Sequence, residues 1–370
     1  MNYWIKERII LMEEKVSNIR TRELNLDLLK ALAIFAMILC HCVIRLAAYI
    51  EGYENSSWYF FADVILGDYV FVAHGFMLAM GACIIFSRNQ EPTYLIKRGI
   101  CIFILAYILN FFRYGIYVLV DGIIEGEFVE ETLDAFFCQD IFHFAGLALI
   151  VTGLLRLLKL KSIHILLIGI ALSIIGGPLA LVVNSNWVVN YFVGFLFFTP
   201  EACFTFFNWY IFVGVGLVFG EVLKKTSDKD KFYKNLLIYS SIITVIYITL
   251  SFIFGALFLS KEHIYYACSI LEAIGLLSID FTFLSIFYFL LKKKDQSRDY
   301  WYTKIAKNTT VIYIIQWCII GLIESVVVFL LGIVFPYWLT YVIGVMLIVV
   351  SIVLADLFKK LKERKRLNNE

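Results

Sequence analysis

The chain has 370 residues, of which 61% are hydrophobic and 17% are charged, and its formal net charge is +2 at pH 7. A mean hydropathy of +0.84 excludes an ordinary soluble globular domain. The composition indicates an all-α, polytopic integral membrane protein whose main partner is the lipid bilayer.

Apolar segments recur along the chain, each near the ~20 residues that a helix needs to cross a bilayer. We expect about ten transmembrane helices, at residues 25–49, 59–86, 96–120, 138–158, 162–183, 203–223, 235–259, 267–291, 309–333 and 337–358. They make one membrane domain, 25–358, between a cytoplasmic or interfacial segment, 1–24, and a basic tail, 359–370. Residues 1–24 are charged and contain no cleavable signal peptide.

The charges of the loops predict the orientation of the helices in the membrane. Of the 32 Lys and Arg residues, 28 lie before residue 23, in 86–98, 156–161, 224–234 and 292–307, or after 358, always on the same side of the alternating spans. The positive-inside rule places both termini in the cytoplasm. The opposite loops are acidic, which argues against a nucleic-acid partner. We expect a multi-pass protein of the cell membrane.

The first apolar segment carries Asp27, Lys30, His41 and Arg45. At about 100° per residue, these side chains share a helix face within roughly 60°, and Lys30 and His41 are ~16 Å apart along the axis. Ionisable groups at membrane depth cost about 2.5–3.5 kcal/mol each, so they usually pair or line a cavity. The stripe predicts a reaction or transport path, with Lys30 near the cytoplasm and His41 in the outer half.

Later segments add polar side chains whose roles the residues alone leave open. Arg113 and Arg45 either form structural ion pairs, for which Asp68 is one of several available carboxylates, or contact the acceptor or an oxyanion. The carboxylates that could orient His41 are Asp63, Asp68, Asp140, Glu272, Asp280 and Glu324. His143 either lines an acceptor site or lies at the interface, and Gln316 is a candidate donor. The eight cysteines show no metal-type clustering, so no metal site is expected.

The run Asp27-x2-Lys30-x10-His41 resembles the first helix of the acyltransferase-3 membrane acyltransferases, which carry an (R/K)-x10-H motif there. Residues 76–86, 94–110, 138–150 and 208–223 are similar to helices of the related heparan-α-glucosaminide N-acetyltransferase-like branch, and 306–320 resemble the penultimate helix of both. Two features depart from the families. Arg98 is followed by Cys101 rather than by a second arginine, and residues 50–62 contain no histidine.

The resemblance implies transfer of an acyl group, commonly acetyl from cytoplasmic acetyl-CoA, to a hydroxyl or amine of an extracytoplasmic saccharide. His41 would be the general base on the acceptor, and Lys30 would help to hold the donor. Acyl-CoA is then a co-substrate, and no tightly bound cofactor is expected. The acyl chain, the acceptor, O- or N-transfer and the oligomeric state stay open.

The main alternative is a secondary transporter or an exporter of saccharides or lipid-linked saccharides. Buried Asp, Glu, His and Arg in ten helices suit proton-coupled transport as well. The first-helix motif and the lack of visible internal repeats favour the enzyme.

Overall fold

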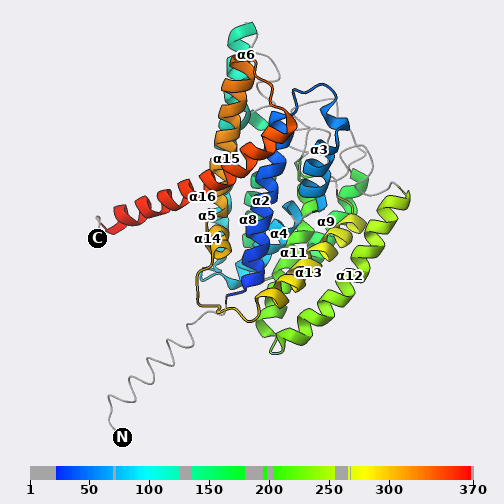
Figure 1. Ribbon diagram of the computed structural model, residues 1–370. Coiled ribbons are helices and arrows are strands. Elements are labelled where there is room, and N and C mark those ends of the chain that lie inside the picture. Colours follow the sequence, from blue (N-terminus) through cyan, green and yellow to red (C-terminus); the bar gives the residue numbers. More distant parts are fainter. Residues whose placement is uncertain are drawn as a thin grey trace.

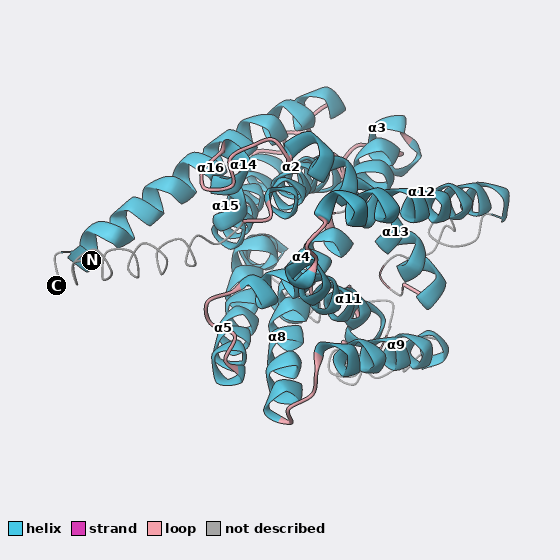
Figure 2. Ribbon diagram, turned by 90° about the horizontal axis from the view of Figure 1, so that it is seen from below, coloured by secondary structure: helices cyan, strands magenta, loops and turns pink. Residues whose placement is uncertain are grey.

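The computed structural model describes residues 22–69, 72–125, 136–179, 195–197, 203–254, 266 and 268–367. Within these residues the chain is helical with no strand, which confirms the expected all-α class (Figures 1 and 2). The helices, in chain order, are α2 Leu24–Leu46, η1 Tyr53–Asn55, α3 Ser57–Phe60, η2 Phe61–Tyr69, α4 Ala73–Phe86, α5 Pro92–Asn110, η3 Phe111–Gly115, α6 Ile116–Glu125, α8 Ile141–Leu157, α9 Ser162–Leu179, α11 Phe206–Lys225, α12 Lys229–Phe254, α13 Ile270–Leu291, α14 Trp301–Lys307, α15 Thr309–Ile323, η5 Glu324–Leu330 and α16 Tyr337–Leu367.

Seven helices in the described residues are long and apolar enough to cross a membrane. They are Leu24–Leu46, Pro92–Gly115, Phe206–Lys225, Lys229–Ile253, Ile270–Leu291, Thr309–Leu330 and Tyr337–Lys365. Three shorter apolar helices, Ala73–Phe86, Ile141–Leu157 and Ser162–Gly176, fall in the remaining expected segments. The full number of crossings and their orientation stay predictions.

Helix α2 lies inside the bundle and contacts α4, α13, α14, α15 and α16 (Figure 1). The other helices pack mainly in pairs, α4 with α11, α5 with α8 and α12 with α13, while α9 lies on α11. Viewed from below, α4 lies between α2 and α11 (Figure 2). Because α2 is enclosed, its polar side chains face other helices.

The pair α4 and α11 crosses at very close range. A Cβ added to Gly216 would lie 2.1 Å from the carbonyl oxygen of Leu78, and one added to Gly81 would lie 2.3 Å from that of Val213. Small residues allow such contact between helix backbones, which is a main source of helix association in a membrane.

A buried polar contact joins α4 to α13. His74 Nδ1 lies 2.9 Å from a carboxylate oxygen of Asp280, and both side chains are fully buried. Asp280 was among the carboxylates considered for His41, but the structure places it on His74.

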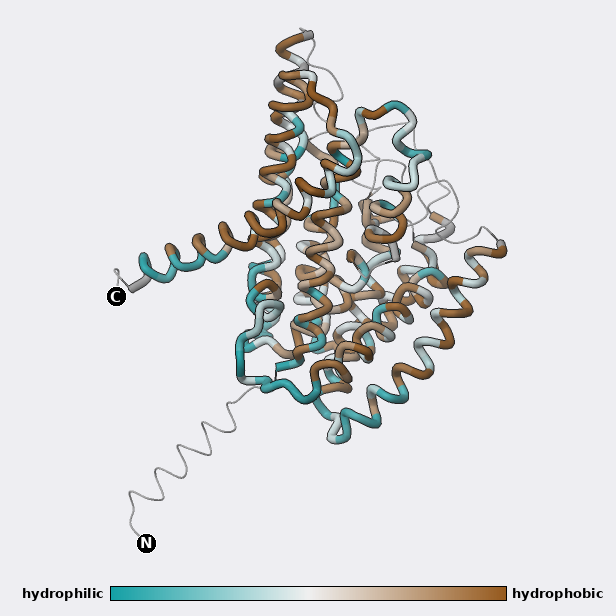
Figure 3. Tube along the Cα trace, viewed as in Figure 1, coloured by the Kyte–Doolittle hydropathy of each residue, from teal (hydrophilic) through white to brown (hydrophobic). Residues whose placement is uncertain are grey.

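Hydrophilic segments at the start of α2, between α4 and α5, at the end of α11 and between α13 and α14 lie at one end of the bundle (Figure 3). Residues from these segments line a common cavity. Helix α16 runs from the opposite end and extends away from the bundle (Figure 1). It continues through the expected boundary at 358 to Leu367, so the described part of the basic tail is helical. Of the expected N-terminal segment, residues 1–21 lie outside the described residues.

Candidate active site

The polar stripe of α2 meets a different partner at each level. At the polar end, Asp27 forms an ion pair with Arg22. One turn later, Lys30 lines a cavity, and three turns beyond it His41 contacts α15. Near the last turn, Arg45 pairs with Glu324 at the start of η5. The stripe therefore faces the protein interior along most of the helix.

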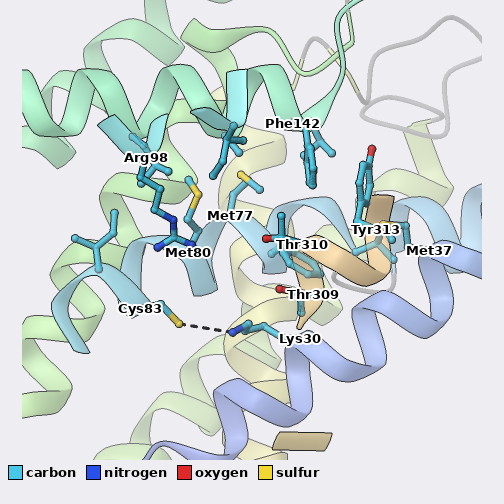
Figure 4. A pocket seen from close by; sticks show the side chains of 17 residues that line it. Lys30, Met37, Met77, Met80, Cys83, Arg98, Phe142, Thr309, Thr310 and Tyr313 are labelled. Carbon is cyan, nitrogen blue, oxygen red and sulfur yellow. Dashed lines mark hydrogen bonds between the residues drawn. The ribbon is translucent and has the colours of Figure 1, made fainter. Parts of the chain in front are cut away.

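A cavity of about 140 Å³ extends between α2, α4, α5, α8 and α15. Lys30 and Arg98 are its charged lining residues, and Lys30 Nζ lies 4.0 Å from Cys83 Sγ. Figure 4 shows Cys83 and Arg98 on one side, Phe142 and Tyr313 on the other, and Lys30 between them with Thr309 and Thr310. The lining contains no carboxylate, so the cavity suits an anionic or neutral ligand.

His41 lies beyond the far end of this cavity and is half-buried. Its Nδ1 lies 3.2 Å from the side-chain nitrogen of Gln316, a fully buried residue of α15. No partner for its Nε2 is found among the described residues. One ring nitrogen is thus held by the protein while the other is free to contact a reacting group.

A buried ion pair lies beside His41. Arg113, from η3, donates a 2.5 Å hydrogen bond to Asp140, the residue before α8, and the Tyr313 hydroxyl donates to the same carboxylate oxygen. All three residues are buried. Tyr313 also lines the cavity, so this network connects the cavity wall to the surroundings of His41.

Aromatic rings fill the space between these charges. The Arg113 guanidinium lies 4.0 Å from the ring centre of Trp317, and the Trp317 and His41 ring centres are 4.3 Å apart. The Tyr313 ring meets His41 edge-on at 6.4 Å and stacks on Phe142 at 4.1 Å. A cation on an indole face is attracted to the ring electrons, so Trp317 orders Arg113 and His41 together.

A second ion pair lies near the last turn of α2. Arg45 donates two hydrogen bonds, of 3.0 and 2.7 Å, to one oxygen of Glu324, and the Tyr49 hydroxyl donates to the other at 2.9 Å. Tyr114 lies between Arg45 and Arg113, with its ring centre 4.8 and 4.7 Å from the two guanidinium carbons. The two ion pairs therefore form one continuous cluster.

Both ion pairs arise where a spanning helix changes to π-helical geometry. Arg113 lies in η3, which continues α5, and Glu324 begins η5, which continues α15. Such π segments are rare and are frequent at functional sites. The close approach of α15 to η3 needs Gly321, since a Cβ there would lie 2.0 Å from the Phe112 carbonyl oxygen.

Several buried polar atoms of this cluster have no hydrogen-bond partner among the described residues. They include Arg113 Nε, Gln316 Oε1 and His143 Nε2. A buried unpaired polar group costs roughly 1–3 kcal/mol, so such atoms are uncommon in native interiors. Their concentration around Arg113 and Gln316 indicates a place where a substrate or water completes the hydrogen bonding.

The structure thus brings five of the seven sequence-derived candidates into one connected region: His41, Gln316, Arg113, Arg45 and, through the cavity, Lys30. His143 adjoins it, accepting a 3.1 Å hydrogen bond from the Asp140 backbone in a capping arrangement at the start of α8, with its ring 4.3 Å from that of Tyr107. Asp68 lies in η2, but its side chain is outside the described part of the chain.

Two other carboxylates considered for His41 have different partners. Glu272 caps α13, where its side chain accepts a 2.6 Å hydrogen bond from the Ser269 backbone, and Glu324 holds Arg45. The residue that contacts His41 is the amide Gln316. Sequence reasoning also missed Trp317, Tyr114 and Cys83, which carry no motif and become visible only through their contacts. Among the described residues, no group of three or more His, Cys, Asp or Glu side chains is placed to hold a metal ion.

Comparison with known families identifies the family of the chain. The family model of the acyltransferase-3 acyltransferase domain matches residues 23–357, which is most of the chain and includes every residue of the cluster. A comparison with curated proteins gives no match.

Proposed function

Because the chain belongs to the acyltransferase-3 family and is built from membrane-spanning helices, we propose that it moves an acyl group from cytoplasmic acyl-CoA to a saccharide outside the cytoplasm. The acyl group of this proposal is acetyl, and the acceptor atom is a hydroxyl oxygen or an amine nitrogen. The protein then modifies cell-surface or secreted saccharides at the cell membrane.

The observation that carries the proposal is the arrangement of the cavity and His41. A cationic cavity without carboxylates ends at Tyr313, whose ring meets His41 edge-on. The free ring nitrogen, Nε2, belongs to the half-buried His41 beyond that end. This geometry suits a donor that enters from the Lys30 end and an acceptor that meets it at His41.

In the proposed reaction, the acceptor hydroxyl or amine attacks the thioester carbonyl carbon. His41 Nε2 takes the acceptor proton as the new C–O or C–N bond forms. The C–S bond then breaks, and the proton passes to the leaving sulfur, so that free CoA thiol and the acylated saccharide result. A positioned base of this kind contributes about 10²–10⁴-fold to the rate.

Gln316 sets the form of His41 that this step requires. A neutral imidazole that accepts a proton at Nε2 carries its hydrogen on Nδ1, which then needs an acceptor. A half-turn of the Gln316 amide presents its unpaired Oε1 to Nδ1 and satisfies both atoms. Gln316 is therefore a positioning residue in this mechanism.

Arg113 supplies charge next to the reacting atoms. Its unpaired Nε–H is a candidate donor to the oxyanion that forms on the thioester carbonyl. Asp140 and Tyr313 fix the guanidinium from the opposite side, so little reorganisation is needed during the reaction. Arg45 and Glu324 close the cluster toward the acceptor side.

The test is turnover by the purified protein with acetyl-CoA and saccharide acceptors, followed as release of free thiol. We expect acceptor-dependent release in the parent and its loss in His41→Ala, with expression and thermal stability retained. Movement of a saccharide across vesicles without any thiol release would identify a transporter instead.

A further inference from the structure

A second, larger cavity of about 920 Å³ opens at the polar end of the bundle. We call it the vestibule. Its walls come from residues 22–27, the segment between α4 and α5, the end of α11 and the loop between α13 and α14. These are segments whose Lys and Arg content predicts a cytoplasmic location.

The vestibule has more positive than negative lining groups. Its cations are Arg22, Arg88, Lys224, Lys229 and Lys307, and its carboxylates are Glu23, Asp27 and Asp299. Each carboxylate already has a cationic partner in the lining, as shown by the pairs Lys229–Glu23, Arg22–Asp27 and Lys307–Asp299.

Arg88 and Lys224 are left without an ion pair among the described residues. They come from different walls, the α4–α5 segment and the last turn of α11. Gln90 holds the first wall in shape by donating to the carbonyl oxygens of Ile85 and Ser87 at 2.6 and 3.1 Å. Two cations without ion pairs in the lining of one cavity give it a net positive charge that suits an anion.

The vestibule adjoins the cavity that ends near His41. Cys83 lines both, and the other charged groups that follow it are Lys30 and Arg98. The cations without an ion pair among the described residues fall into two sets. Arg88 and Lys224 line the vestibule, and Lys30 and Arg98 line the smaller cavity on the other side of Cys83. A ligand that suits them has two separated phosphate groups and a thin neutral arm.

We propose that Arg88 and Lys224 bind the terminal ribose phosphate of the donor, and so select free CoA thioesters over dephospho-CoA and over phosphopantetheine carried by a protein. This selection rests on the proposed use of an acyl-CoA donor. In this arrangement the adenosine and its ribose phosphate lie in the vestibule, the diphosphate reaches Lys30 and Arg98 beyond Cys83, and the pantetheine arm continues toward Tyr313.

The test compares the binding of CoA and of dephospho-CoA, which lacks the ribose phosphate, to the purified full-length protein. In the double variant Arg88→Ala with Lys224→Ala, we expect CoA affinity to fall by about tenfold or more, because charge-assisted contacts to a phosphate are lost. Dephospho-CoA affinity should stay at its parent value. The control is Lys225→Ala, the exposed neighbour of Lys224 that does not line the vestibule.

Four outcomes overturn the inference. If the double variant binds CoA as tightly as the parent does, Arg88 and Lys224 do not form the phosphate site, while the proposed function still stands. An equal loss for dephospho-CoA, or an equal loss in Lys225→Ala, shows a general charge effect. A parent protein that binds no CoA removes the proposed function as well.

Cys83 provides a second readout in the parent protein. If the donor passes it, saturating CoA should slow N-ethylmaleimide labelling of Cys83, measured residue by residue by mass spectrometry. Cys101, exposed on α5 and absent from both cavities, is the control. Labelling of Cys83 at the same rate with and without CoA would contradict the route.

Discussion

The side-chain nitrogen of Gln316 lies 3.2 Å from Nδ1 of His41, so α15 holds the imidazole that α2 carries. The two residues are separated by 275 positions in the sequence. If Gln316 positions His41, its substitution should affect the rate of the reaction, whereas a purely structural role would affect only stability.

Gln316→Leu should lower kcat by about 10- to 100-fold with little change in KM for the donor, since the base loses its orientation but the donor cavity is intact. Gln316→Glu, which keeps an acceptor for Nδ1–H, should recover part of the rate. Steady-state kinetics on both variants measure this, with Cys318→Ala on the same helix as the control. A loss confined to KM would contradict a role through His41.

Breaking the Arg113–Asp140 pair should destabilise the protein strongly. Removing one partner of a buried ion pair typically costs about 3–5 kcal/mol, because the other charge is left buried without compensation. Asp140→Asn should therefore lower the melting temperature more than Tyr313→Phe, which removes one hydrogen bond to a charged group, worth about 1.5–3 kcal/mol. Thermal unfolding in one detergent compares them, and equal shifts would argue against a charged pair.

Gly321→Ala should impair transfer through the position of Arg113. The added methyl would lie 2.0 Å from the Phe112 carbonyl oxygen, so η3 must move away from α15. We expect a large loss of kcat together with reduced stability. Leu322→Ala, an exposed neighbour on the same helix, serves as the control and should be close to the parent in both measurements.

Lys30→Ala should weaken CoA binding more than His41→Ala does. Lys30 lines the cavity beside Cys83, whereas His41 is absent from its lining. Equilibrium binding of CoA to both variants distinguishes the two roles, and Lys97→Ala, on the exposed face of α5, controls for loss of surface charge. Parent-like affinity in Lys30→Ala would remove its assignment to the donor.

The ion pair of Asp299 with Lys307 at the vestibule should stabilise the fold, and this stabilisation should be lost in acid. A 2.6 Å hydrogen bond from Lys307, with Arg22 nearby, holds the pKa of Asp299 below its ordinary value of 3.8. Folding then favours the ionised form, so this stabilisation is present above about pH 4 and is lost as the pH falls through the lowered pKa.

Because Asp299 is half exposed, the effect should lie at the low end of the ~0–1 kcal/mol range of surface ion pairs. The melting temperature of Asp299→Asn should change less than that of the parent between pH 5 and pH 3. Glu363→Gln, on the exposed end of α16, is the matched control. An identical pH dependence in parent and Asp299→Asn would contradict the assignment.

Local pattern predicted the helical class and the family, because hydrophobic runs and the spacing from Asp27 to His41 are properties of single segments. It also indicated that Lys30, His41 and Arg45 face the interior, since helical periodicity puts them on one side. The same reasoning placed Arg113 and Gln316 among the polar residues worth considering.

The residues that these side chains contact could not be predicted from single segments. His41 meets an amide rather than any of the carboxylates considered, and Asp280 meets His74, because both contacts depend on how distant helices cross. The π segments were also unforeseen, since the apolar composition of 111–115 and 324–330 fits an ordinary helix equally well. The vestibule depends on four chain segments whose proximity no single segment encodes.

The close backbone crossing at Gly81 and Gly216 has a mechanical consequence for both cavities. Two helices in such contact cannot slide or separate without losing most of their interface, so α4 and α11 move as a single unit. Glycines pack α5 against α8 in the same way, since a Cβ on Gly99 would lie 2.6 Å from the carbonyl oxygen of Gly146. The smaller cavity therefore lies between three units, the α4–α11 pair, the α5–α8 pair and the wall formed by α2 and the start of α15, and a long ligand that passes Cys83 runs between units rather than through one.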